Sequence, residues 1–467
     1  MFCRMVMRSR AGTPRPFNAL TNCPTVVPLS KTTVSPFFSS TVIVDSLVWV
    51  VCPLLAAAGW DVCLIEKKTF PREKTCGDGL TPRSVRQLAD MGLEPTVAAH
   101  GHKYNGLRAF GFGASLELAW PDHPKFPNYG YTITRFNLDG LVAEAARNHG
   151  ATLLSGVEAV DLVDRTTSPD GLGGAGGVVV KDKESGDTGE VRGRFLVVAD
   201  GQNSRIGREL GVTRNRDWPM GMALRGYYTS DRHAEPWIDS HLDIRDPSGK
   251  VVPGYGWVFP LGDGRINVGV GLLSTGGAWK GVNTTKLQEY FVAQIADDWG
   301  LSEATSCGPA TGGRLPMGLA LGPRVGANVL CVGDATGTIN PFNGEGIAYG
   351  YESGRLAAGV LGEALAASDS ALLSLYEERL EQAYGEYYKV ARAFVRIISE
   401  PTILAACVGL GLRIEPLMRE LLDIMANLMR NDTRGPSELG YRALVRLADA
   451  LPEKAYQLLL GSEGSRD

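Results

Sequence analysis

One stretch in the second half of the chain, residues 332–350 (VGDATGTINPFNGEGIAYG), constrains the fold more than any other. The apolar run from Val329 to Val332 predicts a short buried strand, which ends at Gly333-Asp334. Two closely spaced glycines then open a long helix of small residues. This order places free main-chain N–H groups beside one fixed carboxylate. Such a site suits the hydroxyls and the electron-rich carbonyl edge of a flavin. The alternative is an ordinary strand-to-helix loop.

The composition sets the class of protein and excludes several functions. A chain of 467 residues with 21% charged and 44% hydrophobic residues predicts a soluble globular protein of two or three domains. The net charge of −4 gives no reason to expect a nucleic-acid partner. The eight cysteines contain no C-x-x-C pair and the six histidines are dispersed. We therefore expect no metal centre, and a reducing compartment.

The first 58 residues differ in composition from the rest. They contain one glycine, Gly12, where the chain-wide frequency predicts about seven. Asp45 is their only acidic residue, and several arginines among Ser and Thr imitate a transit peptide. The apolar run 42–58 is short for a membrane helix and is interrupted by Asp45 and Pro53. A membrane helix is therefore not favoured here.

A dinucleotide-binding unit is predicted from residue 54, but one of its signals is missing. LLAAAG predicts a helix ending at Gly59, and DVCLIE predicts a buried strand ending at Glu66. A carboxylate at that strand end is where such folds hold the adenosine ribose. The G-x-G-x-x-G loop should lie about 20 residues earlier. That window, Ile43 to Val48, reads IVDSLV, so side chains fill the space that a pyrophosphate needs. Either the dinucleotide is bound weakly or differently, or these N-terminal residues are not those of the functional gene product.

A glycine turn at Cys76-Gly77-Asp78-Gly79 precedes a predicted helix from about Thr81. A lone cysteine in a core is usually a small hydrophobic residue. A cysteine flanked by glycine at the start of a helix is instead a candidate for a lowered pKa or for contact with an active site.

The middle of the chain alternates strands and helices. Residues 104–134 predict strands, and Arg135 precedes an amphipathic helix that we expect Asn137 to cap. Phe195 to Ala199 predicts another buried strand. It ends at Asp200-Gly201, before a helix that begins near Ser204.

From 213 to 318 the sequence is rich in strands and aromatic residues. Tyr255, Trp257 and Phe259 share one face of a predicted strand. Such residues are more often core than pocket, but a separate inserted region makes them candidates for the wall of an apolar cavity. After 366 the pattern is helical. These helices are either core helices or a layer that covers a lipid tail or rests on a membrane surface.

Five motifs in this order resemble the geranylgeranyl reductase family of flavoproteins, within the p-hydroxybenzoate hydroxylase-like group. They are Glu66 at its strand end, CGDGLTPR (76–83), ADGQNSRIGR (199–208), YGWVFP (255–260) followed by GVG (269–271), and CVGDATGTINPFNGEGIAYG (331–350). The motifs are especially similar to those of actinobacterial enzymes that saturate one isoprene unit of menaquinone. The resemblance covers residue 54 to at least 400, and the missing G-x-G-x-x-G is its main departure.

The resemblance implies an α/β fold. It has a Rossmann-like FAD-binding domain of the glutathione-reductase type, an inserted mixed β-sheet substrate domain and C-terminal helices. The expected parts are an FAD-binding domain (42–105, 130–212 and 320–365), a substrate domain (106–129 and 213–319), a C-terminal helical region (366–467) and an atypical N-terminal segment (1–41). That segment is either targeting-like or an artefact of the gene model, such as a frameshift.

The resemblance also assigns site residues. Glu66 is expected to bind the ribose, Arg135 the phosphate or ribityl side of FAD, and Asp334 the ribityl hydroxyls. The other expected cofactor contacts are Cys76, Gly77, Asp78, Gly79 and Leu80 beside the ring, Asp200 and Gly201 at the pyrophosphate, Gly344, Glu345, Gly346 and Ile347 at the pyrimidine edge, and Gly333 and Pro341. The expected substrate contacts are Tyr255, Trp257 and Phe259.

The implied reaction is saturation of an isoprenoid double bond in a prenyl lipid. The expected electron donor is NAD(P)H or another reductant. An isolated trisubstituted alkene is a poor hydride acceptor, so proton delivery should lead, with Cys76 or a water that it holds as the relay. A cytoplasmic protein with peripheral contact to the inner face of the membrane is expected. The alternatives are a flavin monooxygenase or halogenase of the same fold, and a flavoprotein-like binder that lacks its cofactor.

Overall fold

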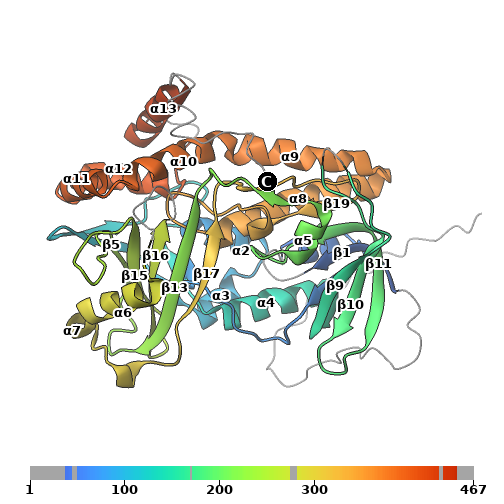
Figure 1. Cartoon of the computed structure of the whole chain (residues 1–467), viewed down its shortest axis with the longest axis horizontal. Coiled ribbons are helices and arrows are strands. Elements are labelled where there is room, and N and C mark those ends of the chain that lie inside the picture. The colour runs from blue at the N-terminus through green and yellow to red at the C-terminus, as the bar shows by residue number, and fades with distance from the viewer. Residues whose placement is uncertain (1–36, 45–49, 169–170, 274–280, 431–434, 450–467) are drawn as a thin grey trace, which may run out of the picture.

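The computed structural model describes residues 37–44, 50–168, 171–273, 281–430 and 435–449, and Figure 1 shows two sheets side by side beneath a layer of C-terminal helices. The first sheet has the order β8-β2-β1-β11-β10-β9, with β19 beside β11. Its parallel strands are β8, β2, β1, β11 and β19, whereas β10 is antiparallel to both of its neighbours. The bounds are β1 Phe37–Val44, β2 Val62–Glu66, β8 Thr152–Ser155, β9 Val157–Val163, β10 Gly177–Asp182, β11 Thr188–Val198 and β19 Val329–Cys331.

Side chains along these strands point alternately to the two faces of the sheet, and each face belongs to a separate apolar core. Ile43, Leu64 and Val197 belong to the core that includes residues of α1 (Val51–Ala57), α4 (Arg135–Asn148) and α8 (Ile347–Ala367). The intervening residues, such as Val42 and Ile65, belong to a second core with α5 (Arg205–Leu210). Both faces of the sheet are therefore buried, which explains why β2 is apolar without interruption until Glu66.

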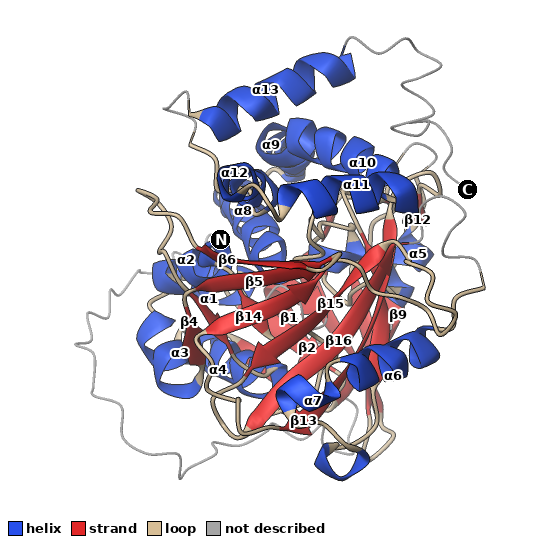
Figure 2. Cartoon of the chain, turned by 90° about the vertical axis from the view of Figure 1, so that its left-hand side faces the viewer, coloured by secondary structure: helices blue, strands red, loops and turns tan. Residues whose placement is uncertain are grey.

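The second sheet combines two distant parts of the chain. Its order is β17-β13-β16-β15-β14-β5-β6, so the hairpin β5–β6 pairs through β14 with strands from 220–316. The bounds are β5 Gly106–Gly111, β6 Ala114–Ala119, β13 Met220–Thr229, β14 Trp237–His241, β15 Gly254–Pro260, β16 Arg265–Leu273 and β17 Thr311–Pro316. On one face, Val258, Ile266 and Val268 pack under α6 (Thr284–Gln294). Trp257 and the other residues that alternate with these therefore point to the opposite face of the sheet. Figure 2 shows α6 lying against this sheet.

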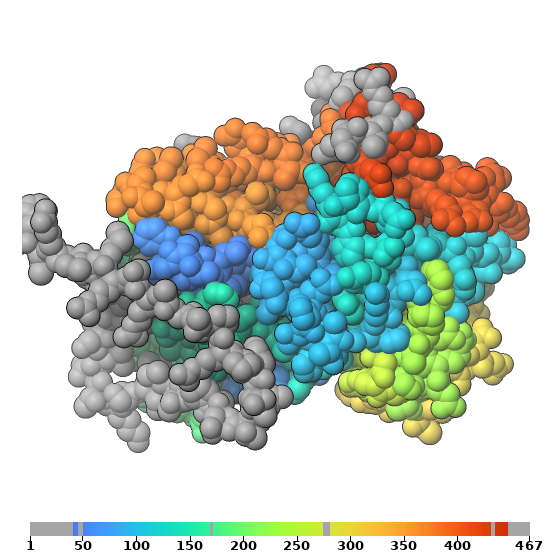
Figure 3. Space-filling model, turned by 180° about the vertical axis from the view of Figure 1, so that it is seen from behind, coloured from blue at the N-terminus to red at the C-terminus, as the bar shows by residue number. Residues whose placement is uncertain are grey.

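A smaller sheet and the remaining helices complete the fold. The small sheet has the order β3-β7-β4, and β12 pairs with β18. The C-terminal helices form one long edge of the molecule, coloured orange to red in Figure 3. The bounds are β3 Gly79–Leu80, β4 His102–Tyr104, β7 Gly130–Thr132, β12 Thr213–Arg214, β18 Leu321–Gly322, α2 Pro82–Asp90, α3 Glu94–His100, α7 Ala296–Trp299, α9 Leu375–Leu380, α10 Glu386–Ile398, α11 Pro401–Gly411, α12 Glu415–Met425 and α13 Pro436–Asp449.

Most predicted elements are present, with two local corrections. The helix before Gly59, the strand ending at Glu66 and the helix with Pro82 in its first turn are confirmed. The predicted cap of α4 is wrong, because the helix begins at Arg135 and the Thr134 hydroxyl accepts the N–H of Asn137 at 3.4 Å. The first strand begins at Phe37, inside the segment predicted to be atypical, because Phe37 onward pairs with β11.

The apolar run 42–58 forms the end of β1 and the helix α1 on either side of residues 45–49. Within the described ranges, no single helix is long and apolar enough to cross a membrane. The helical segments Ser370–Ile398 and Pro401–Gly411 are together long and apolar enough for a membrane span, but the pair is bent by 104°.

Candidate cofactor and substrate site

The predicted site begins at the carboxyl edge of the first sheet. β2, β11 and β19 run parallel, with β1 between β2 and β11. Glu66 at the end of β2, Asp200 after β11 and Asp334 after β19 therefore lie at the same edge of the sheet. Ligands of open α/β sheets bind at this edge. The fold therefore brings together three acidic residues that the sequence places far apart.

The turn at 76–80 is held by a buried hydrogen-bond network. Asp78 has a φ of 65°, and its Oδ2 accepts from the Tyr227 hydroxyl at 2.6 Å and from Asn267 Nδ2 at 2.8 Å. Its Oδ1 accepts the main-chain N–H of Arg135 at 3.2 Å. Burial raises the pKa of Asp78 to about 6, although the hydrogen bonds and two arginines oppose the shift. Asp78 is thus a scaffold of the turn rather than a free ligand.

Asn267 joins this turn to the aromatic strand. It is fully buried, and its Nδ2 donates to the Cys76 carbonyl at 3.0 Å as well as to Asp78. Its Oδ1 accepts from Trp257 Nε1 at 2.9 Å. One amide therefore fixes both the glycine turn and an aromatic residue of β15.

Two of the three predicted substrate residues, Trp257 and Phe259, lie directly against the glycine turn, and Tyr255 lies beside Trp257. The ring centroids of Tyr255 and Trp257 are 5.7 Å apart, and those of Trp257 and Phe259 are 6.1 Å apart. A Cβ atom built on Gly79 would lie 2.9 Å from the Phe259 ring. One built on Gly269 would lie 2.3 Å from the Trp257 ring. The glycines of both motifs are thus required by the close approach of this aromatic row.

The start of α8 touches the same row. The Tyr255 hydroxyl donates to the Asn343 carbonyl at 2.9 Å, next to Gly344, whose φ is 75°. Glu345 points toward α2, where its Oε1 accepts from the hydroxyls of Thr81 and, at 3.1 Å, Ser84. Burial raises the pKa of Glu345 to about 7. Its side chain therefore ties the segment before α8 to the start of α2.

Asp334 meets the requirement for a ribityl ligand. Its side chain is half-buried, and its Oδ1 is a buried atom with no hydrogen-bond partner among the described residues. A Cβ built on Gly346 would lie 3.6 Å from this oxygen, so the absence of a side chain there leaves the carboxylate facing the start of α8. An unpaired buried carboxylate oxygen requires a donor, and a flavin's ribityl hydroxyl is such a donor. This part of the structure fits FAD.

Glu66 and Arg135 take part in a buried ion-pair chain. Glu66 accepts from Arg72 Nε at 3.1 Å, and Arg72 donates to Asp139 at 2.7 Å. Arg135 Nε also donates to Asp139 at 2.7 Å. Glu66 and Arg135, which are expected to contact different parts of the cofactor, are thereby linked through Arg72 and Asp139. Their roles as ligands stay predictions.

The other predicted cofactor residues surround these groups. Asp200 Oδ2 accepts the N–H of Arg205 at 3.1 Å, and Gly201 has a φ of 79°. Gly333 donates its N–H to Ser353 Oγ at 3.3 Å. Leu80, Pro341 and Ile347 are buried. Residues 45–49, which carry most of the prediction of a missing phosphate loop, lie outside the described residues.

Cys76 is half-buried at the turn, and desolvation raises the pKa of its thiol. The predicted alternative of a lowered pKa is therefore wrong, because the loss of hydration outweighs the nearby charge of Arg135. A neutral thiol retains its proton.

Several residues that hold the site were missed from the sequence. Tyr227 and Asn267 come from β13 and β16, 149 and 189 positions from Asp78. The only local signal was the Asn267 amide between apolar neighbours in the strand RINVGVGLL.

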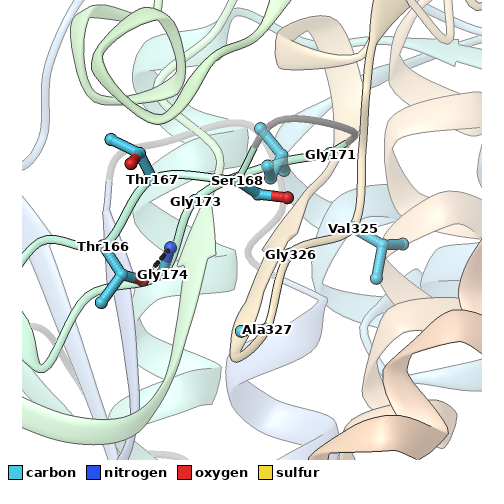
Figure 4. Close-up of a pocket in the computed structure, with 10 residues that line it drawn as sticks. Thr166, Thr167, Ser168, Gly171, Gly173, Gly174, Val325, Gly326 and Ala327 are labelled. Atoms are coloured by element: carbon cyan, nitrogen blue, oxygen red, sulfur yellow. Dashed lines mark hydrogen bonds between the residues drawn. The ribbon is translucent and has the colours of Figure 1, made fainter.

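Two cavities lie beside the site residues rather than among them. One of about 350 Å³ is bordered by Thr166, Ser168 and the loop 325–327 (Figure 4). Another, of about 470 Å³, lies beside Gln202, Asn203 and Arg314. None of the residues predicted to bind cofactor or substrate lines either cavity.

The fold and this site define the class, an FAD-dependent oxidoreductase with an α/β FAD-binding fold. A family model described as "FAD binding domain" matches residues 50–226. A geranylgeranyl bacteriochlorophyll reductase-like protein from Thermoplasma acidophilum superposes with a TM-score of 0.68 at 20% identity, over 84% of this chain and 99% of that one. A flavin-dependent brominase superposes with a TM-score of 0.66 at 17% identity, over 88% and 99%. At these identities the superpositions show the fold alone.

Sequence relatives identify the family. A menaquinone reductase of Mycobacterium tuberculosis is 38% identical over 400 residues, 85% of this chain and 93% of the relative. A digeranylgeranylglycerophospholipid reductase of Methanosphaera stadtmanae is 28% identical over 74% of this chain and 84% of the relative. The chain belongs to the geranylgeranyl reductase family of flavoproteins, in which it is similar to menaquinone reductases. The predicted family, fold class and FAD dependence are therefore confirmed.

Proposed function

We propose that this protein is an FAD-dependent reductase that saturates an isoprenoid double bond in a prenyl lipid, with the prenyl tail of menaquinone as the substrate. The relatives at 38% identity are menaquinone reductases, and more distant relatives reduce digeranylgeranylglycerophospholipids by name. These substrates share a long isoprenoid chain. The apolar row on β15 suits such a chain and offers little to a charged substrate.

The contact between the aromatic row and the two glycine motifs carries the proposal. Trp257 and Phe259 lie against the turn at 76–80, and Tyr255 reaches the main chain beside Gly344. The residues expected to border the flavin ring and those expected to border the alkene are thus in direct contact.

The reaction adds one hydride and one proton across a carbon–carbon double bond. Bound FAD supplies the hydride. Asp334 would hold the ribityl chain, and the N–H groups at the start of α8 would stabilise negative charge on the reduced pyrimidine ring. Cys76, whose thiol is neutral, is the proposed proton source or holds the water that serves as one. The aromatic row orients the chain and excludes water.

The proposed substrate also implies a location and a donor. A menaquinone tail resides in a bilayer, so we propose peripheral contact with the cytoplasmic face of the membrane. A reduced nicotinamide dinucleotide or another two-electron reductant would reduce the flavin.

An anaerobic assay tests the proposed reaction. Holoenzyme reduced with dithionite should convert menaquinone to a product heavier by two hydrogens, detected by mass spectrometry. A strict requirement for O₂ would indicate a monooxygenase or halogenase. Purified protein without the visible absorbance of flavin would indicate a binder without cofactor.

Cys76→Ser tests the proposed proton relay. Product formation should slow by about 100-fold while the rate of flavin reduction is unchanged, because general acid catalysis contributes roughly that factor. Cys307→Ser, at an exposed cysteine, is the matched control. Wild-type turnover in Cys76→Ser would remove this residue from the mechanism.

A further inference from the structure

The helix α11 is apolar on both its inner and its outer side. Its sequence, PTILAACVGLG, contains no charged residue. Leu404 and the following Leu412 are buried. Yet Ile403 is 39% exposed, and Leu410 is 61% exposed. A helix that is hydrophobic all round is normally buried in a core or in a membrane.

Exposed aliphatic residues also lie at the start of α12. Ile414, which precedes the first residue of α12, and Leu417 are 40% and 41% exposed. Ile397, at the end of α10, is 41% exposed. We call these five residues the α11–α12 face. Since α10 and α11 meet at 104°, no straight span is formed, and the face is suited to lying on a bilayer instead of crossing it.

The inner side of the same helix packs on the substrate sheet. A Cβ built on Gly111 of β5 would lie 3.0 Å from Val408 and 3.5 Å from Leu412. Further along, Leu422 of α12 shares one apolar cluster with Leu107 of β5 and with Phe259 of the aromatic row. Apolar contacts thus run from the proposed prenyl site to the elements that carry the α11–α12 face, which lie over β5 in Figure 2.

A lipid surface fits this face better than a protein partner does. The α11–α12 face consists of five partly exposed aliphatic side chains. A stable protein interface buries about 800 Å² on each partner, which is more than so few side chains provide. Arg413 lies between α11 and α12, exposed, and donates to the carbonyls of Gly409 and, at 3.5 Å, Phe112. Among the described residues it contacts no carboxylate, so its charge is available to a lipid phosphate.

We propose that the α11–α12 face inserts into the headgroup–acyl boundary of an anionic bilayer, and that the prenyl chain enters the site from this side. This inference rests on the proposed function for the entry of the prenyl chain, but the binding of a bilayer can be tested without it.

Flotation of the holoenzyme with vesicles of phosphatidylethanolamine and phosphatidylglycerol in equal parts tests the surface. Leu410→Asp/Ile414→Asp should lower the fraction bound by about tenfold, because two aliphatic anchors become charged. Leu439→Asp on α13, where the leucine is 53% exposed, is the matched control and should float like the wild type. Retained flavin absorbance and an unchanged Tm show that the variants fold.

Two further results would overturn the inference. Wild-type holoenzyme that stays with the lipid-free fraction contradicts bilayer binding. A wild-type dimer that becomes monomeric in Leu410→Asp/Ile414→Asp, measured by sedimentation without lipid, would assign the face to self-association.

An activity measurement separates this inference from the proposed function. With a short-prenyl menaquinone dispersed in water, the double variant should match the wild type. With long-chain menaquinone in vesicles it should be about tenfold slower. If the wild type floats but reduces neither quinone, the proposed function fails and the lipid surface stands. If it reduces both but does not float, the lipid surface fails and the function stands.

Discussion

Two strand-to-helix junctions meet at the carboxyl edge of the first sheet, and they are built differently. At β19–α8 the helix begins with Gly346 as its N-cap, after an acidic turn and a glycine of positive φ. At β1–α1 the helix follows Val50, which is fully buried and has helical dihedral angles and no capping side chain. The sequence from Asp45 to Val50 contains no glycine.

The two junctions, which correspond to the two halves of the predicted dinucleotide site, differ in their polar contacts. The β19–α8 junction is tied to other elements by Tyr255, by Thr81 and Ser84 through Glu345, and by Ser353. None of these contacts involves β1 or α1. The hydrogen bonds of the β19–α8 junction therefore do not depend on β1 or α1, although α1 and α8 share one apolar core.

The largest effect is expected at the β19–α8 junction. Asp334→Ala should weaken FAD binding by about 100-fold, or about 3 kcal/mol, because a carboxylate that accepts ribityl hydroxyls contributes roughly this much. Titration of apoprotein with FAD, followed by flavin fluorescence, measures the change. Glu363→Ala, on the exposed part of α8, is the control. An unchanged Kd in Asp334→Ala would show that this junction does not hold the ribityl chain.

The second variant separates holding the cofactor from positioning the substrate. Asn267→Leu removes the bonds to Cys76, Asp78 and Trp257 with little change of volume. It should lower kcat by about 30-fold, near 2 kcal/mol, with the Kd for FAD unchanged. Tyr227→Phe removes a single bond to Asp78 and should have a smaller effect. Equal loss of FAD binding and turnover in Asn267→Leu would indicate general disruption instead of a positioning role.

At the β1–α1 junction, introducing glycines should strengthen FAD binding instead of weakening it. Asp45→Gly/Leu47→Gly removes one negative charge and one side chain from the sequence where a pyrophosphate would approach, and it should tighten FAD binding by about tenfold. The same titration measures it. If the Kd is unchanged, the phosphate half of the site is not limited by the missing glycines, and the contrast between the junctions loses its functional meaning.

The smallest effect is a change in the pH dependence of stability. Because the pKa of Glu345 is raised from 4.5 to about 7, the folded state retains a proton that the unfolded state releases within this window. Stability therefore falls as pH rises through it. Glu345→Gln should make the free energy of unfolding less dependent on pH in this range. The slope should change by at most about 1.4 kcal/mol per pH unit, which corresponds to one proton. Urea unfolding of the holoenzyme across this range checks it, with Glu144→Gln on the surface of α4 as the control. A slope that the substitution leaves unchanged would show that Glu345 is charged in the folded protein.

The sequence predicted the parts of the fold that follow from local chemistry. Pro82 and Thr81 mark the start of α2, the alternation of Tyr255, Trp257 and Phe259 marks β15, and the acid after an apolar run marks the end of β2. Each depends on neighbours within a few positions, so the pattern is visible along the chain.

The sequence could not predict features that depend on contacts between distant segments. Asn267 became part of the site only because β16 runs beside β15 and across the turn at 76–80. Desolvation at that turn also decided the direction of the pKa shift of Cys76. The same holds for Glu345, which bonds across to α2, 264 positions from Thr81.

The pairing of β5 with β14 has a consequence for how the chain folds. Arg108 and Asp239 form an ion pair across these strands at a separation of 131 positions. During synthesis the hairpin β5–β6 therefore emerges long before its neighbour, with one edge unpaired. Closing so long a loop slows folding and leaves that edge open to wrong partners in the meantime. The second sheet is thus expected to be the last part of this protein to form.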